Sequence, residues 1–323
     1  MGVSGLEITE ERLRSKFVGC LLGVAVGDAL GASFEGLPPI EAGWVEVEGT
    51  LRYTDDTQMT IGVAESLIEN GGFNGEHMAK TFIKNYDPTR GYGPGPPRVF
   101  RWIKAGIPWN EAAKRLYGGM GSYGNGAAMR IAPVGLLYYD EPDKLEEIAR
   151  QVSSITHTHP LGVEGAAIQA YAVALAVKTE PESLDREAYI QKLLDIAESP
   201  VYRGKLEAVR ELLRVNASRS LVVRELGNGV EAFNSVPTAI YTFLSTETFK
   251  EAVLHAISLG GDTDTIASMT GAIAGAHHGE ESIPKTWINA LENGEKGRTY
   301  IKNLAEELWR MKTQKRRRVK KPY

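Results

Sequence analysis

The sequence predicts an all-α fold, and three observations lead to this prediction. Many segments carry apolar residues at intervals of three and four, which is the spacing of one face of a helix. No helical segment alternates with β-branched strands, so a doubly wound sheet is not expected. No linker rich in Pro, Gly or Ser divides the 323 residues. We therefore expect one compact all-α domain at residues 1–311 and a basic C-terminal tail at residues 312–323.

The first expected helix, residues 17–32, carries glycine at every fourth position. These glycines fall on one helical face and are Gly19, Gly23, Gly27 and Gly31. Small residues on one face allow a second backbone to approach closely, as happens in membrane helices. This run is interrupted by Asp28, and we expect no apolar run of the chain to be long enough to cross a bilayer.

The second expected helix, residues 56–69, follows a polar run and ends at the letters "NGG". Its apolar spacing is set by Met59, Val63 and Leu67. Helical periodicity predicts further helices at residues 110–117, 143–156, 165–177, 184–197, 205–215, 236–243, 249–259, 264–276 and 300–312. Residues 45–53 are expected to form a short extended segment.

Two loops between these helices concentrate glycine: "RGYGPGPP" at residues 90–97 and "YGGMGSYGNG" at residues 117–126. Glycine allows backbone N–H groups to converge on an anion. In the second loop, Tyr123 fits a helix-entry turn with a core tyrosine. It also fits a pyrophosphate site with an aromatic face for a base. Neither the Walker pattern nor the dinucleotide fingerprint is present, so the loop alone does not decide between these interpretations.

Charge and cysteine content exclude several classes of protein. The net charge of −4 does not fit a general nucleic-acid binder, although the end of the chain, "KTQKRRRVKKPY", is strongly basic. That tail is either a solvated terminus or a contact surface for nucleic acid or another polyanion. Cys20 is the only cysteine, so an intramolecular disulfide is excluded. Charged residues among the first 15 stand where a signal peptide needs an apolar core, and we expect a cytoplasmic monomer without membrane contact.

Three acidic clusters are the main candidates for chemistry. They are "GDALGASFEG" with Asp28 and Glu35, "YTDDTQMT" with Thr54, Asp55 and Asp56, and "GGDTDT" with Asp262, Asp264 and Thr265. Two of the clusters directly precede expected helices, where Asp and Thr are favoured N-caps. Capping needs one side chain per helix, whereas each of these two clusters supplies up to four oxygen donors. Their occurrence together in one chain favours metal binding.

The residue types in these clusters indicate a hard cation. A thiolate zinc site is excluded because there is no second cysteine. Carboxylate and hydroxyl oxygens suit Mg²⁺, Mn²⁺ or Ca²⁺. The spacing and closing Glu of an EF-hand are missing, so a calcium sensor is not expected. Four or more carboxylates can hold two ions, which would explain why so many acids are present.

Four motifs in order, "GCLLGVAVGDALGASFEG", "YTDDTQM", "GSYGNGAAMR" and "GGDTDTIASMTGAIAGA", resemble the ADP-ribosylglycohydrolase family. That family includes the dinitrogenase reductase-activating glycohydrolase and the ADP-ribosyl-acceptor hydrolases. The resemblance covers about residues 17–279. Within the family, "RGYG", "GSYGNG", "ELGNGVEAFNSVPTAIY" and "SLGGDTDTIA" look most similar to the ADP-ribosylserine hydrolase branch. That branch is also credited with cleavage of poly(ADP-ribose) and O-acetyl-ADP-ribose.

The resemblance implies an orthogonal bundle of helices with two Mg²⁺ ions in a cleft, Mn²⁺ being an alternative. By position it implies metal ligands at Thr54, Asp55, Asp56, Asp262, Asp264 and Thr265. Glu35 matches the family's mobile glutamate, which is both metal-linked and catalytic. The positions that match ADP-ribose contacts are Gly91, Gly93, Gly121, Ser122, Tyr123, Gly124 and His157, with Tyr117 where an aromatic residue helps to sandwich the adenine. This sequence departs from the family pattern at "GPGPP" in the first glycine-rich loop, where the prolines stiffen the backbone and remove N–H donors.

The function implied by the resemblance is Mg²⁺-dependent hydrolysis of the bond between ADP-ribose and an acceptor, with serine-linked ADP-ribose as the main substrate. The partner would be an ADP-ribosylated protein or a free ADP-ribose derivative. One alternative is a hydrolase of arginine-linked ADP-ribose or of another N-glycosidic substrate in the same fold. Another is a module that binds ADP-ribose without cleaving it. Glu35 and the two Asp clusters argue against the last, since pure binding does not need them.

Overall fold

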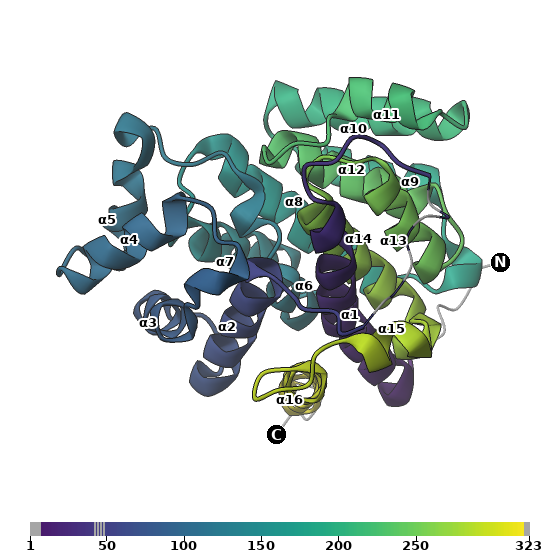
Figure 1. Ribbon diagram of the computed structural model, residues 1–323. Helices are drawn as coiled ribbons and strands as arrows, with labels where there is room; N and C mark the ends of the chain where they lie inside the picture. The colour runs from purple at the N-terminus through teal and green to yellow at the C-terminus, as the bar shows by residue number, and fades with distance from the viewer. Residues whose placement is uncertain (1–7, 42, 44, 46, 48, 320–323) are drawn as a thin grey trace.

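A computed structural model describes residues 8–41, 43, 45, 47 and 49–319 of the chain, with side chains up to residue 315. In these residues the secondary structure consists of helices and turns without a strand, which confirms the all-α prediction (Figure 1). The expected extended segment at 45–53 lies partly outside the described residues. In its described part, Leu51 forms an isolated bridge with Leu291.

The helices follow one another along the described chain with short connections. Their bounds are α1 Glu10–Gly31, α2 Asp55–Asn70, α3 Gly75–Asn85, α4 Gly95–Lys104, α5 Trp109–Ala112, α6 Ala132–Leu137, α7 Pro142–Ser154, α8 Pro160–Lys178, α9 Arg186–Ile196, α10 Pro200–Arg214, α11 Arg219–Leu226, α12 Ala232–Leu244, α13 Phe249–Ser258, α14 Thr263–His278, α15 Lys285–Ala290 and α16 Arg298–Val319. Every helix predicted from periodicity overlaps one of these. The sequence analysis missed α3, α4, α6, α11 and α15.

Helix α4 corrects the expectation of a loop over residues 90–97, because it begins at Gly95 inside "GPGPP". Prolines in the first turn of a helix lose no hydrogen bond, since the first N–H groups have no partner within the helix. The expected helix at 110–117 is also different. Its first half is α5, and its second half is a 3₁₀ segment broken at Leu116, Tyr117 and Gly118, where the backbone leaves helical angles.

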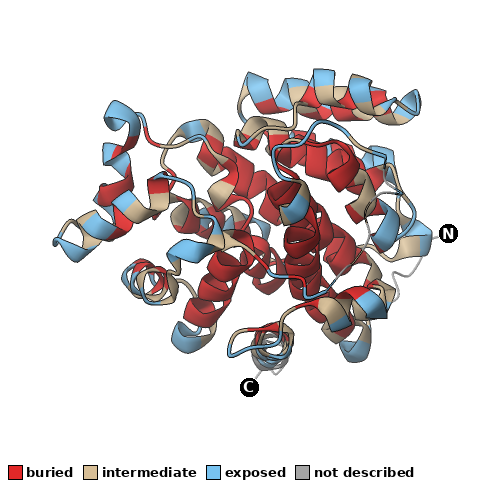
Figure 2. Cartoon of the chain, viewed as in Figure 1, coloured by how far each residue is buried: buried red, intermediate tan, exposed pale blue. Residues whose placement is uncertain are grey.

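Helices α1 and α14 lie side by side at the centre of the molecule, where the burial map is almost entirely red (Figures 1 and 2). Their backbones touch along the glycine face of α1. A Cβ on Gly23 would lie 2.2 Å from the Gly271 carbonyl oxygen, and a Cβ on Gly27 would lie 2.1 Å from that of Ala267. The close approach of a second backbone to the glycine face of α1 is confirmed, and α14 supplies that backbone. It brings the C-terminal end of α1 to the N-terminal end of α14.

Within the described residues, two helices are long and apolar enough to span a membrane, which corrects the expectation that no apolar run is long enough. The windows lie in Glu10–Phe34 and Pro160–Lys178, and they are 83% and 78% buried. Most of their residues are packed inside the domain, and core helices of a helical domain are apolar for this reason. Asp28 is tolerated inside the first window because it is hydrogen-bonded there.

The expected boundary of the basic tail at residue 312 falls inside α16, which continues to Val319. Lys312 is 2% exposed and forms ion pairs with Asp140 and Glu141. Lys315 donates a 2.9 Å hydrogen bond to the Gly71 carbonyl oxygen at the end of α2. These two lysines therefore hold α16 against the rest of the domain. The remainder of the expected polyanion surface lies outside the described side chains.

Candidate metal centre and ligand cavity

The close packing of α1 and α14 gathers carboxylates from three segments, and all of them except Glu35 are buried. One group comprises Asp28, Asp56 and Asp264, and a second comprises Glu35, Asp262 and Asp264. Within each group, one oxygen from every residue lies within 4.8 Å of the others. Asp264 belongs to both groups, so the two form one continuous acidic site. The Thr265 hydroxyl also donates to Asp56 Oδ2 at 3.4 Å, which joins the start of α14 to the start of α2.

Asp28 of α1 holds the N-terminal turn of α2 in place. Its carboxylate accepts hydrogen bonds from the Thr54 and Thr57 N–H groups, each at 3.0 Å. It also accepts from both hydroxyls, that of Thr54 at 2.7 Å. Capping of α2 is thus shared between Thr54 and a carboxylate from another helix. Asp55 and Asp56, which were candidates for that role, remain free to face the cavity.

The start of α14 is fixed by contacts that also leave its carboxylates available. Asp262 stands at the N-cap but makes no side-chain capping bond. Its Oδ2 instead accepts a hydrogen bond from the Asn125 side chain. Gly260 and Gly261 have φ of 68° and 76°, and a Cβ on either would collide with backbone of residues 37–39 or 228. Only glycine fits this turn, which explains the pair that precedes "DTDT".

The electrostatics of this site favour a bound cation. Burial, and then repulsion from Asp262 and other acids, raises the pKa of Asp264 to about 9. Burial and repulsion from Asp28 and Asp264 likewise raise the pKa of Asp56 well above its ordinary value. Asp56 Oδ1 is buried and has no hydrogen-bond partner among the described residues. An oxygen without a donor, surrounded by other carboxylates, fits coordination by a hard divalent cation.

Glu35 differs from the other acids because it is exposed. It follows α1 and the short 3₁₀ turn Ala32–Phe34, on a segment hydrogen-bonded to the turn before α14. The Gly36 N–H donates to the Gly261 carbonyl oxygen at 2.8 Å. The Glu35 carboxylate therefore stays close to Asp262 and Asp264 while it remains accessible to water and ligand.

Above the acids lies an open cavity of about 220 Å³. Twelve of the sequence-predicted site residues line it: Glu35, Asp55, Asp56, Gly91, Gly93, Tyr117, Ser122, Gly124, His157, Asp262, Asp264 and Thr265. Thr54 does not line the cavity, because its hydroxyl is committed to Asp28. The N-terminal turn of α4, from Pro94 to Pro96, forms part of the wall. Residues far apart in the sequence thus share one cavity, as the metal hypothesis requires.

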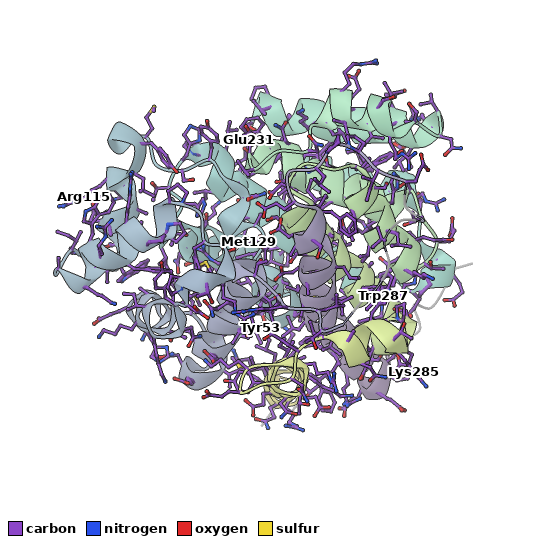
Figure 3. The ribbon with its side chains drawn as sticks, in the orientation of Figure 1. Tyr53, Arg115, Met129, Glu231, Lys285 and Trp287 are labelled. Atoms are coloured by element: carbon purple, nitrogen blue, oxygen red, sulfur yellow. The ribbon has the colours of Figure 1, made fainter. Side chains whose placement is uncertain are left out.

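A second cavity of about 310 Å³ adjoins the first and includes the remaining predicted residues, Gly121 and Tyr123. It shares Tyr117, Ser122 and Gly124 with the first. Tyr117 and Tyr123 are 46% and 48% exposed, so both rings are available to a ligand. In Figure 3, Met129 of the first cavity lies near the centre of the view and Glu231 of the second lies above it, whereas Arg115 lies at the left edge.

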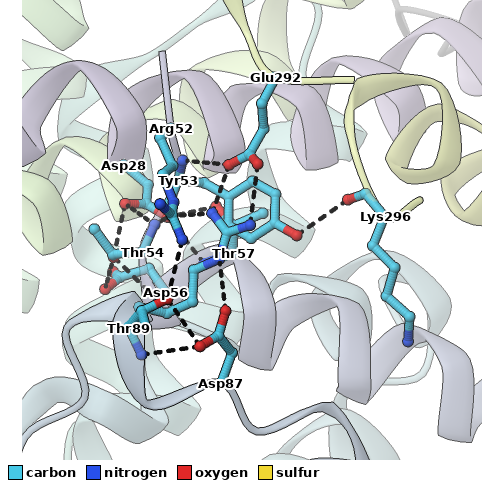
Figure 4. A network of polar contacts seen from close by, with 11 residues as sticks. Asp28, Arg52, Tyr53, Thr54, Asp56, Thr57, Asp87, Thr89, Glu292 and Lys296 are labelled. Atoms are coloured by element: carbon cyan, nitrogen blue, oxygen red, sulfur yellow. Dashed lines mark hydrogen bonds and ion pairs between the residues drawn. The ribbon is translucent and has the colours of Figure 1, made fainter. Parts of the chain in front are cut away.

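A polar network supports the Thr54–Asp56 segment from outside the cavity (Figure 4). The Arg90 guanidinium stacks on the Tyr53 ring at 4.0 Å from its centroid. It donates to the Tyr53 carbonyl oxygen at 2.7 Å and to Glu292 Oε2 at 3.0 Å. Glu292 in turn accepts from the Tyr53 N–H at 3.0 Å. Arg90 directly precedes the predicted ligand residue Gly91, so one network positions both the acidic turn and the first glycine loop.

Sequence reasoning missed several residues of the site. Asn125 lies inside the motif "GSYGNG", whose glycines indicate a turn. The motif gives no sign that the Asn125 side chain donates a hydrogen bond to Asp262. Asp28 belongs to one of the acidic candidate clusters, but its function as an anchor of α2 can be recognised only when it is known which helices touch. The cavity walls also include Met129, Thr156 and Val230, for which no sequence signal was available.

The fold and the site together define an all-helical protein with an acidic cavity suited to hard cations. Comparison with known proteins is consistent with this class. Residues 9–318 match the family model described as ADP-ribosylglycohydrolase. The chain belongs to the ADP-ribosylglycohydrolase family.

Named relatives and a solved structure extend this result. The chain is 39% identical to the ADP-ribosylhydrolase ARH3 of Mus musculus, with 87% of this chain and 88% of the relative covered. It is 25% identical to the ADP-ribosyl-[dinitrogen reductase] glycohydrolase of Rhodospirillum rubrum, with 88% and 93% covered. A solved structure titled ADP-ribosylglycohydrolase-related protein complex matches with a TM-score of 0.73 and 28% identity, covering 94% of this chain and 99% of that one.

Proposed function

We propose that this protein hydrolyses the glycosidic bond between ADP-ribose and an acceptor, with serine-linked ADP-ribose as its main substrate. Poly(ADP-ribose) and O-acetyl-ADP-ribose are further substrates of the same site. Its cofactor is a pair of Mg²⁺ ions, which Mn²⁺ can replace. The observation that carries the proposal is the buried acidic site centred on Asp264, at the base of a cavity lined by glycine-rich turns. Family membership and the similarity to the mouse hydrolase support it.

The residues present fit a cation pair. Asp56 and Asp264 would hold one ion, and Glu35, Asp262 and Asp264 the other, with Asp55 and Thr265 beside them. Bound there, the cations would supply positive charge that fixes the ribose hydroxyls and polarises the reacting bond. Asp28 and Asn125 keep the acidic turns in register through their hydrogen bonds. Neither needs to touch substrate to do so.

Glu35 is the residue placed for proton transfer. Cleavage of a ribosyl bond develops positive charge on the sugar and negative charge on the leaving group. An exposed carboxylate beside the cavity can take a proton from the attacking water, or can give one to the leaving serine oxygen. The buried acids are less suited to this task, because their oxygens face one another at the cation site.

The exposed aromatic residues and glycine turns of the two cavities fit the rest of ADP-ribose. Tyr117 and Tyr123 offer ring faces on which an adenine can stack. Gly91 and Gly121, with φ of 85° and 73°, lie in the glycine-rich turns of the cavity walls, and turns of this kind can bind a diphosphate. The N-terminal turn of α4 adds its positive dipole to the cavity wall.

The proposal is tested by incubating the protein with serine-linked and arginine-linked ADP-ribosyl peptides and measuring free ADP-ribose. We expect release from the serine-linked peptide in Mg²⁺, and its loss in a chelator. Release from the arginine-linked peptide alone would instead support the N-glycosidic alternative. Binding of ADP-ribose without release from either peptide would support a non-catalytic module and contradict hydrolysis.

The matched variants for this assay are Glu35→Gln and Glu111→Gln. We expect Glu35→Gln to lower turnover by about 10²–10⁴-fold, the usual size of a general acid–base contribution, while ADP-ribose binding persists. Glu111 is exposed and paired with Lys114 on α5, outside both cavities, so Glu111→Gln controls for loss of one surface charge. Unchanged turnover in Glu35→Gln would remove Glu35 from the mechanism.

A further inference from the structure

We propose that Thr156 and Arg130 are positioning residues that hold His157 in a single neutral tautomer, with its Nε2–H directed into the ligand cavity. In this form the imidazole donates a hydrogen bond to an anionic oxygen of the ligand. The inference deepens the proposed function and rests on it for the identity of the ligand. The state of the ring itself follows from contacts within the protein.

The three side chains form a chain of short contacts. Arg130 is fully buried, and its guanidinium donates to the Thr156 hydroxyl oxygen at 2.6 Å. Thr156 Oγ1 lies 2.8 Å from His157 Nδ1. Arg130 is itself held by the carbonyl oxygens of Gly126 at 3.0 Å and Val152 at 2.8 Å. The guanidinium therefore cannot turn away from Thr156 without losing buried hydrogen bonds.

The direction of each hydrogen bond follows from what the groups can do. A guanidinium can only donate, so Thr156 Oγ1 accepts from Arg130. Among the described residues, His157 Nδ1 is the remaining partner of that hydroxyl. Donation by Thr156 to Nδ1 uses the hydroxyl hydrogen and leaves Nδ1 without a proton. The opposite arrangement, with Nδ1–H donating, would leave a buried hydroxyl hydrogen without an acceptor, which is costly. The neutral ring must then carry its proton on Nε2.

The other edge of the ring lies at the cavity. A Cβ on Gly126 would be 3.1 Å from His157 Nε2, and a Cβ on Gly124 would be 3.6 Å from it. Both glycines and His157 line the cavity. Nε2 has no hydrogen-bond partner in the part of the chain that the structure describes. Its partner is therefore expected to come from the ligand.

A second proton on the ring is opposed by the same surroundings. Burial, and then the positive charge of Arg130, lowers the pKa of His157 to about 3. The imidazole thus acts as a neutral donor rather than as a cation. This suits a cavity that also contains the proposed cation site, because a further positive charge would repel divalent cations.

The state of the ring can be measured directly by ¹⁵N NMR of protein labelled at histidine. The His157 signals are identified as those lost in His157→Gln. We expect Nε2 to be protonated and Nδ1 to be unprotonated in the metal-loaded wild-type protein, without titration between pH 5 and pH 8. A protonated Nδ1, or titration of the ring in that range, would overturn the proposal whether or not any variant folds.

Variants of Thr156 then connect the tautomer to binding. Thr156→Val keeps the shape but removes the hydroxyl, and we expect mixed tautomers and an affinity for ADP-ribose lower by about tenfold, the usual cost of one hydrogen bond to a charged group. Thr156→Ser should restore both. Ser154→Ala is the matched control, because the Ser154 hydroxyl bonds only the Gln151 carbonyl oxygen within the same helix.

Two further outcomes are distinguishable. An unchanged tautomer and unchanged affinity in Thr156→Val would refute the positioning role. If the wild-type protein shows the expected tautomer but does not bind ADP-ribose, the tautomer assignment is supported and the proposed function is rejected.

Discussion

At the scale of single residues, the site depends on acids that stay close together although they repel one another. Asp28 can be buried because four N–H and O–H groups donate to it, whereas Asp56 retains an oxygen without a donor. Asp28 therefore anchors a helix, whereas Asp56 has an oxygen available to coordinate a cation. Without the cation, protons must take its place, and this gives the site a distinctive dependence on pH.

The pKa values predict how the stability of the metal-free protein changes with pH. Burial raises the pKa of Asp262 to about 6, that of Asp55 to about 7 and that of Asp264 to about 9, each from 3.8. The folded state therefore keeps protons that the unfolded state releases. This contribution to stability is fully present below pH 3.8 and is lost as pH rises through these values toward about 9.

The measurement is thermal unfolding of the protein between pH 5 and pH 8, in chelator and in saturating Mg²⁺. The buried His157 and His277 have lowered pKa values and act in the opposite direction, so the difference between the two curves isolates the acidic site. We expect the stabilisation by Mg²⁺ to grow with pH and to reach about 3 kcal/mol at a hundred times the dissociation constant. The increase of this Mg²⁺ stabilisation with pH should be smaller in Asp264→Asn. A stabilisation by Mg²⁺ that does not change with pH would contradict this account.

At the scale of elements, the backbone contact between α1 and α14 is what places the acidic turns. The contacts recur at each glycine of α1, and the last of them, Gly31, lies against Thr263 and Asp264 at the start of α14. The Thr263 hydroxyl also donates to the Gly31 carbonyl oxygen at 2.8 Å. A substitution at any of these backbone contacts between α1 and α14 should therefore weaken cation binding.

Gly27→Ala tests the contact between α1 and α14. The added methyl group would lie 2.1 Å from the Ala267 carbonyl oxygen, and a helix backbone cannot move aside as a flexible side chain can. We expect the free energy of unfolding to fall by about 1–3 kcal/mol, as in other overpacked cores, and Mg²⁺ affinity to fall with it. Gly204→Ala is the matched control in α10, since no atom of the described residues lies within 4 Å of the added methyl group. That change should raise stability by about 0.5–1 kcal/mol, as expected for Gly to Ala within a helix. Equal effects of the two substitutions on chemical denaturation would refute the importance of the contact.

The elements also show what sequence reasoning can reach. Long helices such as α2, α8 and α14 could be located because their apolar residues extend over several turns. Short helices such as α6 and α15 offer too few turns for a pattern. Helix α4 was missed for another reason: its prolines were interpreted as loop residues, although the first turn of a helix accepts them. Helix α3 carries a clear apolar face with Met78 and Phe82 and could have been predicted.

At the scale of the whole molecule, the site is assembled from segments that are far apart in the sequence. The acidic clusters could be identified from residue type and order, and their meeting could be inferred from the glycine face of α1. The supports that hold them could not be inferred, because each depends on a tertiary contact. Asn125 reaches Asp262 across 137 positions, and Arg90 reaches Glu292 across 202. No local sequence pattern predicts hydrogen bonds between residues so far apart.

The central claim is that the acidic site around Asp264 holds two divalent cations at the base of the ligand cavity. Anomalous X-ray scattering from crystals grown with Mn²⁺ tests it most directly. We predict two strong anomalous peaks in the cavity, both in contact with Asp264, one beside Asp56 and the other beside Asp262. Their absence at saturating Mn²⁺, or peaks found only elsewhere in the molecule, would contradict the account.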